Sequence, residues 1–205
     1  KSSWTADTVA GLGGDLARAL RTARSGRPGP VHVALPVDLL EAQIDRETAM
    51  PTPEEFDAPG LAVDSSSAQQ IVDALATARR PLVLAGPAMM RGERRDALSS
   101  LGEAAQLPVV AMESPRGVND PSLGAFAEVL PEADLILLLG KKLDFSVGQG
   151  KAPAVGDGCR FIQVDADPAI LEQTRRTLAD PARLPLAYLA DPASMARQIA
   201  GLAGS

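Results

Sequence analysis

The sequence has few of the side chains that build disulfides, metal centres and nucleophilic catalytic sites. Its 205 residues include one cysteine, one histidine, one tryptophan and one tyrosine. Because a lone cysteine cannot form an internal disulfide, we expect a reducing compartment and a structural thiol at Cys159. The single histidine excludes a cluster of histidines around a metal, and any Cys/His pair would need Cys159. His32 stands in an apolar run, where a packed histidine is more common than a base.

Long hydrophobic runs and an excess of positive charge are also missing. No apolar run approaches the roughly 20 residues that cross a bilayer, and the first residues lack the apolar core of a signal peptide. We therefore expect a cytoplasmic protein. The net charge of −6 and the pI of about 4.9 argue against a nucleic-acid partner, which needs clustered Lys and Arg. Neither a Gly-x-Ser-x-Gly elbow nor a Walker phosphate loop is present.

The remaining pattern is that of a globular chain in two parts, with 45% hydrophobic and 22% charged residues. Apolar residues follow helical spacing over residues 9–23, and glycines and prolines then precede a predicted strand over 31–35. Residues 38–63 lose this periodicity and gather prolines among acidic residues, which is typical of a linker. The predicted parts are a domain tail at 1–45, a linker at 46–63 and a main domain at 64–205.

Strands and helices alternate throughout the predicted main domain. Short apolar runs, typical of buried strands, occupy residues 82–85, 109–112, 135–139, 161–164 and 186–189. Helical patterns cover 65–79 and 93–105. Asp-Pro pairs at 167–168 and 191–192 are typical helix starts, with Asp as the N-cap. The alternation predicts a doubly wound, Rossmann-like α/β fold: a six-stranded parallel sheet with helices on both faces, preceded by the helix and strand of the tail.

In such sheets, ligands bind at the carboxyl ends of the strands, beside helix N-termini. Glycine lets a backbone approach phosphate closely, Arg and Lys pair with phosphate, and a carboxylate suits ribose hydroxyls. The candidate cofactor-binding residues with these properties are Gly86, Arg116, Gly117, Gly140, Lys142, Asp165 and Asp191. Glycines and charges fill such turns in any α/β protein, so spacing alone favours neither a nucleotide site nor plain turns.

Two other motifs are interpreted as structural. Gly11-Leu12-Gly13-Gly14 has the glycines of a dinucleotide loop, but residues 1–8 do not show a strand pattern before it. Gly156-Asp157-Gly158 matches the start of a metal-binding motif that also needs a later Asn, and the only Asn of the chain, Asn119, lies upstream. We therefore predict a tight turn at Asp157. No residue of this chain is predicted to be catalytic.

Several segments together resemble a known family. Residues 25–38, SGRPGPVHVALPVD, are similar to the end of a pyrimidine-binding domain, and residues 79–86, RRPLVLAG, to the opening of the domain that follows it. Residues 133–140 and 161–165 are similar to its later strands. The chain thus resembles, over nearly all its length, the central domain of thiamine diphosphate enzymes of the acetolactate synthase, oxalyl-CoA decarboxylase and benzaldehyde lyase group.

The resemblance implies a role inside a larger enzyme. Thiamine diphosphate and Mg²⁺ would be held by a pyrimidine domain before this chain and a diphosphate domain after it, in a parent lyase or synthase that forms dimers or tetramers. The central domain of such enzymes carries no catalytic group and supports the assembly. The alternative from another class is a free-standing nucleotide-binding or regulatory module of the same fold.

Some relatives hold FAD or ADP in this domain, which would place it against the candidate residues named above. Two segments depart from the pattern of those relatives. Gly86-Pro87-Ala88-Met89 lacks a second glycine, and Gly140-Lys141-Lys142 replaces Gly-Ala-Arg, so the fork and stacking plane of Arg are lost. Three states stay open from the sequence: FAD or ADP bound, another nucleotide or part of CoA bound, and a scaffold without a ligand.

Overall fold

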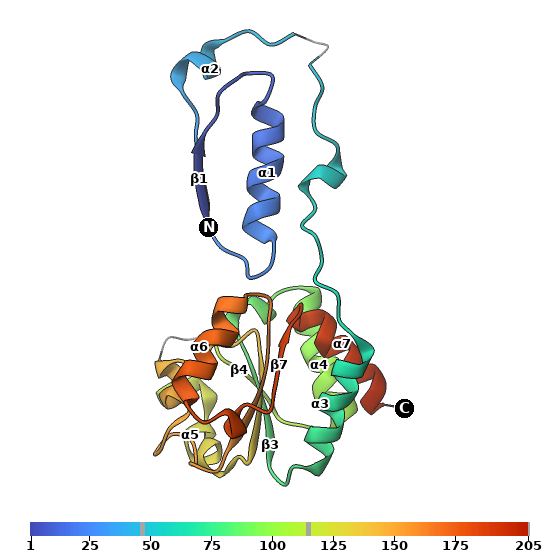
Figure 1. Cartoon of the computed structure of the whole chain (residues 1–205), viewed down its shortest axis with the longest axis vertical. Coiled ribbons are helices and arrows are strands. Elements are labelled where there is room, and N and C mark those ends of the chain that lie inside the picture. Colours follow the sequence, from blue (N-terminus) through green and yellow to red (C-terminus); the bar gives the residue numbers. More distant parts are fainter. Residues whose placement is uncertain (46–47, 114–115, 205) are drawn as a thin grey trace. The chain divides into compact units, whose positions relative to one another are not determined.

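The computed structural model describes residues 1–45, 48–113 and 116–204, and the chain divides into two compact units (Figure 1). Unit 1 is Lys1–Gly60 and unit 2 is Leu61–Ser205. The predicted linker includes residues 46–47, which lie outside the described residues.

Unit 1 is a small parallel β-α-β arrangement. Strand β1 (Ser2–Thr5) pairs in parallel with β2 (Val31–Ala34), and helix α1 (Leu12–Arg24) connects them. The short helices α2 (Val37–Glu41) and η1 (Pro53–Phe56) follow.

The interpretation that residues 1–8 form no strand is wrong, because Ser2–Thr5 is strand β1. Three of its four residues are polar or hydroxylic, so it shows no apolar pattern, and it exists because its backbone pairs with β2. The prediction of a packed His32 is also wrong within unit 1. Its side chain is exposed, and its Nδ1 lies 3.1 Å from the Ser3 hydroxyl.

Unit 2 contains a single parallel sheet in the strand order β4-β3-β5-β6-β7. The sheet therefore has five strands among the described residues, and the prediction of six is wrong: the apolar runs supply five, and the remaining strands of the chain pair with each other in unit 1. The strands are β3 (Pro81–Ala85), β4 (Val109–Ala111), β5 (Leu135–Leu139), β6 (Arg160–Asp165) and β7 (Leu186–Leu189).

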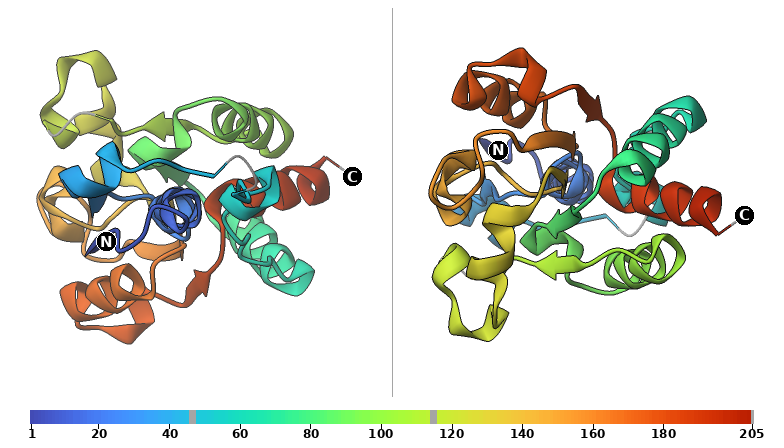
Figure 2. Two further views of the ribbon diagram at one scale, coloured as in Figure 1. Left: turned by 90° about the horizontal axis from the view of Figure 1, so that it is seen from above. Right: turned by 90° about the horizontal axis from the view of Figure 1, so that it is seen from below.

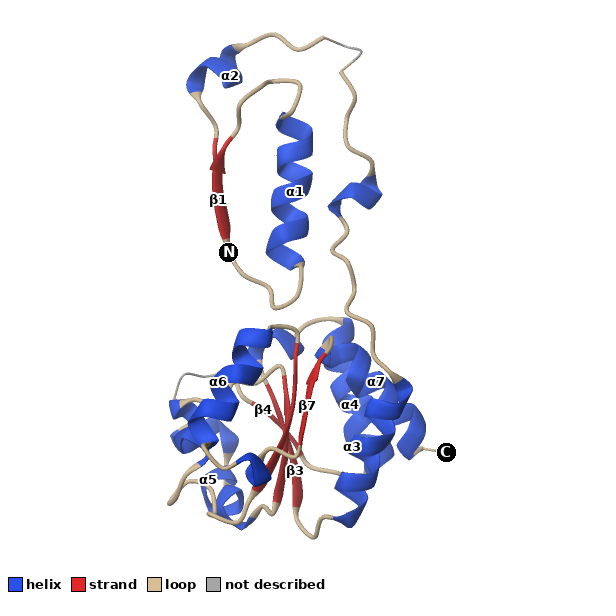
Figure 3. Ribbon diagram, in the orientation of Figure 1, coloured by secondary structure: helices blue, strands red, loops and turns tan. Residues whose placement is uncertain are grey.

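Helices cover both faces of this sheet, as predicted for a doubly wound fold (Figure 3). Helices α3 (Ser65–Thr77), α4 (Glu93–Ala105) and α7 (Pro192–Ala203) share one face, where α7 packs against the other two (Figure 2). The other face carries α5 (Phe126–Val129) and α6 (Pro168–Leu178). Short 3₁₀ segments lie in the connections: η2 (Pro87–Met89), η3 (Gly117–Asn119), η4 (Pro121–Leu123), η5 (Leu130–Glu132), η6 (Phe145–Gly150), which is kinked, and η7 (Pro181–Arg183).

The core forms on both faces of β5, whose five apolar residues are all buried. Side chains alternate across a strand, so Leu135, Leu137 and Leu139 join the cluster under α3, α4 and α7. Ile136 and Leu138 join the cluster on the opposite face. The five-residue apolar run thus has the cause inferred from the sequence, a strand covered on both sides.

The predicted helix starts and the predicted tight turn are confirmed. Asp167 and Asp191 are the N-caps of α6 and α7, and their carboxylates accept hydrogen bonds from the backbone N–H groups of Ala169 and Ser194. At Asp157 the chain makes a tight turn closed by the Cys159 N–H and the Gly156 carbonyl, 3.0 Å apart. Burial raises the pKa of Cys159 to about 12, which fits the inert structural thiol expected there.

No helix in the described part of the chain is long and apolar enough to cross a membrane.

Replacing Leu137 by Ala is expected to destabilise unit 2 by about 3 kcal/mol, because it leaves a cavity inside a strand buried on both faces. Leu189→Ala is the matched control, since Leu189 is also on a strand but is exposed, and should change stability by less than about 1 kcal/mol. Denaturant unfolding followed by circular dichroism measures both. Equal effects of the two variants would contradict the core described here.

Candidate functional site

The strand order creates one topological switch point, between β3 and β5. The chain leaves β3 for its neighbour β4 on one side and then returns to β5 on the other. A crevice at the carboxyl ends of the strands on either side of such a point is where ligands bind in open α/β sheets. Gly86 follows β3 and Gly140 follows β5, so the structure places these two candidates at the switch point.

Four of the other candidates lie along the same edge of the sheet or in its loops. Asp165 ends β6, and Asp191 comes just after β7. Lys142 belongs to the loop after β5 and is half-buried. Gly117 opens η3 after β4 and touches Ser146 of η6, which follows β5. Arg116, next to it, is exposed, and residues 114–115 before it lie outside the described residues.

The backbones of Gly86 and Gly140 approach so closely that neither a ligand nor a side chain fits between them. A Cβ atom on Gly86 would lie 2.0 Å from the carbonyl oxygen of Gly140. The N–H of Gly86 donates to the Leu139 carbonyl at 3.0 Å, which holds the two turns together. Glycine at position 86 is therefore required by backbone packing at the switch point.

Glycine is also required at position 117, because backbone from a neighbouring loop lies where a side chain would be. The φ of Gly117, +62°, is in the left-handed region, and a Cβ there would lie 2.2 Å from the carbonyl oxygen of Ser146. Ser146 is in turn fixed by Asp144, whose carboxylate accepts from its N–H at 3.1 Å and from its hydroxyl at 2.6 Å. The loop after β4 and the loop after β5 are thus joined backbone to backbone.

The two candidate carboxylates have structural roles in this arrangement. Asp165 is 1% exposed, and its carboxylate accepts a hydrogen bond from the N–H of Asp167 at 3.0 Å. Asp191 caps α7 through Ser194 and forms an ion pair with Arg94, Nη2 to Oδ2 at 3.0 Å. Burial raises the pKa of Asp191, but the Ser194 hydrogen bonds and the Arg94 charge outweigh it and leave the pKa below its ordinary value.

Sequence reasoning missed an ion pair beside Gly140 between a buried lysine and a half-buried aspartate. The ammonium of Lys141, a residue 4% exposed, lies 2.9 Å from Oδ1 of Asp144 and donates to the Lys142 carbonyl at 2.7 Å. Burial raises the pKa of Asp144, but hydrogen bonds from Ser146 and Lys141 and the Lys141 charge outweigh burial and leave the pKa below its ordinary value. A lysine in a turn is ordinarily expected to be exposed to solvent, so the sequence pattern did not predict this ion pair.

Gln163 lies under the same loop and also went unnoticed. It is fully buried on β6, and its side-chain amide donates to the Lys141 carbonyl at 3.3 Å. Its Oε1 has no hydrogen-bond partner among the described residues. A single Gln among the three apolar residues of the predicted strand 161–164 indicates only that its side chain is buried. One hydrogen bond from this buried side chain therefore holds the Lys141 carbonyl in the turn after β5.

The described residues provide no site for a metal. Nowhere in residues 1–45, 48–113 and 116–204 do three His, Cys, Asp or Glu side chains converge as ligands. Residues of unit 2 that would meet Mg²⁺ or the diphosphate of thiamine diphosphate are therefore not identified.

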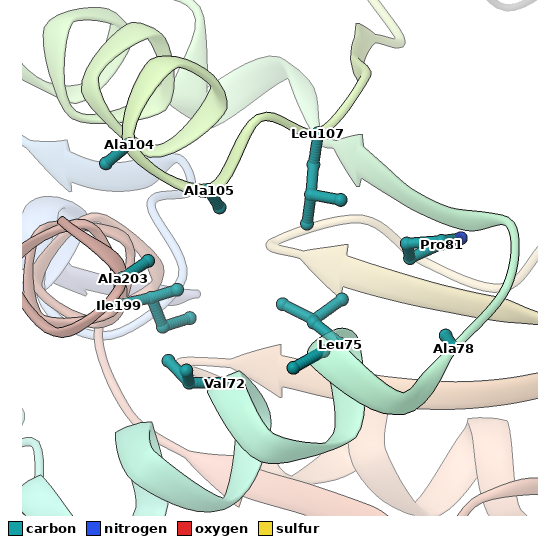
Figure 4. A pocket seen from close by; sticks show the side chains of 10 residues that line it. Val72, Leu75, Ala78, Pro81, Ala104, Ala105, Leu107, Ile199 and Ala203 are labelled. Carbon is teal, nitrogen blue, oxygen red and sulfur yellow. The ribbon is translucent and has the colours of Figure 1, made fainter.

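A cavity of about 350 Å³ opens at the opposite end of unit 2, beside the start of β3 (Figure 4). Side chains from the last turns of α3, α4 and α7 point into it, and all of them are apolar. With no polar or titratable side chain in its wall, it offers no chemistry. Its lining residues are Val72, Leu75, Ala76, Ala78, Pro81, Ala104, Ala105, Leu107, Ile199 and Ala203.

Gly86→Ala is expected to destabilise unit 2 by about 3 kcal/mol or more, because its methyl group must displace the Gly140 carbonyl. Gly201→Ala, on α7, is the control: nothing lies within 4 Å of its added methyl group, and Ala in a helix should be neutral or stabilise by up to about 1 kcal/mol. Thermal unfolding of the two variants tests this. A Gly86→Ala protein as stable as the Gly201→Ala protein would contradict the close approach.

Asp144→Asn is expected to lower the free energy of unfolding by about 1–3 kcal/mol near pH 7, because the buried Lys141 ammonium loses the carboxylate charge 2.9 Å away. The folded-state pKa of Asp144 is lowered, so its stabilisation is complete above the unfolded pKa of about 4 and disappears as the pH falls through the folded value. The difference between variant and wild type should therefore shrink below about pH 4.

The matched control for this pair is Glu172→Gln, which removes an exposed ion pair with Arg176 and should cost less than about 0.5 kcal/mol. Urea unfolding at a series of pH values measures both variants. A pH-independent Asp144→Asn effect would show that the charge of the pair is not what stabilises the loop.

Comparison with known proteins identifies the family. The model of the family described as "Thiamine pyrophosphate enzyme, central domain" matches residues 68–189. Oxalyl-CoA decarboxylase of Escherichia coli K12 is 31% identical over 182 residues, which are 85% of this chain and 32% of that protein. The acetolactate synthase large subunit of Parasynechococcus marenigrum is 30% identical over 191 residues, 86% of this chain and 31% of that protein.

A third relative, 2-hydroxyacyl-CoA lyase 1 of Dictyostelium discoideum, is 28% identical over 173 residues, 78% of this chain and 29% of that protein. The chain spans about a third of the length of the curated relatives it matches. All five strands of the unit 2 sheet, from Pro81 to Leu189, lie within the matched residues 68–189. The chain therefore belongs to the thiamine pyrophosphate enzymes, as their central domain.

Proposed function

We propose that this chain is the central part of a thiamine diphosphate-dependent lyase or synthase that acts on 2-oxo acids or related acyl substrates. It supports the assembly and is not catalytic alone. The observation that carries the proposal is the family match over unit 2, joined to the lack of any metal-ligand cluster in the described residues. Relatives named decarboxylase, synthase and lyase share this domain, so it is compatible with all three reactions.

Unit 1 supports the same proposal, because it cannot bury its own apolar surface. Its sheet has two parallel strands, whereas parallel sheets are normally covered on both faces. Leu16 and Leu20 on α1 are 44% and 50% exposed, and Val37 and Leu40 on α2 are also exposed. We propose that residues 1–45 end a pyrimidine-binding domain whose remaining strands and helices cover these side chains.

The cofactors follow from this placement. Thiamine diphosphate and Mg²⁺ would bind between the pyrimidine domain and a diphosphate domain of the same polypeptide, outside this chain, in a dimer or tetramer. The buried, unreactive Cys159 fits a cytoplasmic enzyme. When bound, thiamine diphosphate supplies the nucleophilic carbon that attacks the substrate carbonyl, and this chain keeps the domains that hold it at their correct separation.

A free-standing nucleotide-binding module is the alternative, and unit 1 argues against it. Such a module would gain nothing from an extra β-α-β unit that exposes Leu16, Leu20, Val37 and Leu40. Large exposed apolar side chains gathered in one small unit are typical of a surface that other residues cover.

The test uses the full-length polypeptide. Purified with thiamine diphosphate and Mg²⁺, it should consume 2-oxo acids, oxalyl-CoA or 2-hydroxyacyl-CoA, with release of CO₂ or cleavage or formation of a carbon–carbon bond. Activity should disappear after dialysis against EDTA and return when both cofactors are added, while residues 61–205 alone should be inactive.

Two outcomes would contradict the proposal. One is activity that needs neither thiamine diphosphate nor Mg²⁺. The other is a full-length sequence without the Gly-Asp-Gly motif and its later Asn downstream of this chain.

A further inference from the structure

We infer that unit 2 fills its switch point with its own side chains and backbone contacts and holds no adenine nucleotide, neither ADP nor FAD. This goes beyond the proposed function, which is the same whether or not the domain carries a nucleotide. Four features of the described residues carry the inference: the space at the switch point, its backbone N–H groups, its carboxylates, and the loop after β5.

The space at the switch point is occupied by two side chains. Met89, in η2 directly after β3, is 0% exposed and belongs to the core cluster under α3, α4 and α7. Pro192 opens α7 and is also buried. A Cβ placed on Gly140 would lie 3.4 Å from Cγ of Pro192 and 3.7 Å from Cγ of Met89. A nucleotide that reached the turn after β5 from this side would have to displace both side chains.

Three backbone N–H groups of the turns after β3 and β5 already have acceptors within the protein. The N–H of Gly86 donates to Leu139, that of Gly140 donates to Val164 at 2.9 Å, and that of Met89 donates to Gly86 at 2.9 Å. Pro87, between Gly86 and Met89, has no N–H to offer. A phosphate cradle of a glycine-rich turn depends on such donors pointing outward, and these point into the protein.

The carboxylates and helix N-termini at the carboxyl ends of the strands also interact with other groups of the protein. Asp165 is buried and bonded to Asp167, which leaves it unable to reach a ribose without unfolding the turn after β6. The N-termini of α6 and α7 are capped by Asp167 and Asp191, and α4 has Glu93 in its first turn. Negative groups at these termini occupy the positive ends of the helix dipoles and repel a phosphate.

The loop after β5 is fixed by its internal ion pair. Lys141 and Asp144 bind each other, Asp144 also holds Ser146, and Ser146 meets the backbone of Gly117. Opening the loop to admit a nucleotide would separate buried Lys141 from half-buried Asp144 and break a backbone contact at the same time. The domain therefore keeps the fold of a nucleotide-binding sheet and uses the binding edge for packing.

The first test asks whether Met89 fills the space. Met89→Ala in the full-length protein should lower the melting temperature of the central domain by about 5–10 °C. Met90→Ala is the matched control, since Met90 is the neighbouring methionine and is only half-buried, and should shift it by no more than about 2 °C. Equal small shifts would mean that Met89 lines an open cleft, which would overturn the inference.

The second test looks for the nucleotide itself. Full-length protein is denatured, the released small molecules are separated, and ADP and FAD are quantified; we expect none above the level of a control protein. A ligand that binds with a micromolar dissociation constant, added at about 100 times that concentration, would raise the melting temperature by several degrees. ADP and FAD added at the same concentration should leave the melting temperature unchanged.

If a nucleotide is found, photocrosslinking with 8-azido-ADP and peptide mapping locates it. A crosslink anywhere in unit 2 would overturn the inference. A crosslink outside unit 2 would support it, because the nucleotide would then belong to another domain. Thiamine diphosphate-dependent activity of the same preparation is measured separately, so a failure of the proposed function cannot be mistaken for a failure of this inference.

Discussion

The close approach of Gly86 to Gly140 is the contact on which the carboxyl edge of unit 2 depends. It joins the turns that follow the two strands beside the switch point, at a separation that only glycine allows. Met89 packs above it, and the Lys141–Asp144 pair fixes the loop that leaves it. These contacts lie at the carboxyl ends of the strands, where this fold class binds ligands, and they agree with the proposal that the domain supports catalysis by other domains.

Much of the fold was predictable because it follows from burial and local hydrogen bonding. The apolar run Leu135–Leu139 identified a strand covered on both faces, since only a doubly covered strand leaves no position for a polar residue. Asp167 and Asp191 identified two helix starts, because an Asp side chain followed by Pro satisfies N–H groups and suits the first helical position. The family resemblance, which rests on segments of several residues each, is confirmed by the match over residues 68–189.

The rest depends on contacts between residues far apart in sequence. The strand Ser2–Thr5 is short and polar, and only its pairing with Val31–Ala34 makes it a strand. The burial of Lys141 depends on Asp144 and on the turn that Gly140 makes, which no periodicity encodes. Likewise the sequence showed glycines at the candidate site but could not show whether a ligand or the protein's own backbone takes the space beside them. Gly86 and Gly117 both face backbone.

Hydrogen exchange of the backbone amides of Gly86 and Gly140 in the ligand-free protein tests the central claim most directly. Both amides donate to carbonyls of the neighbouring strands, Leu139 and Val164. If the switch point is closed by the protein itself, they should exchange as slowly as the amides of β5, which require global unfolding of the domain. Exchange as fast as that of an exposed loop, slowed only when a nucleotide is added, would contradict the account.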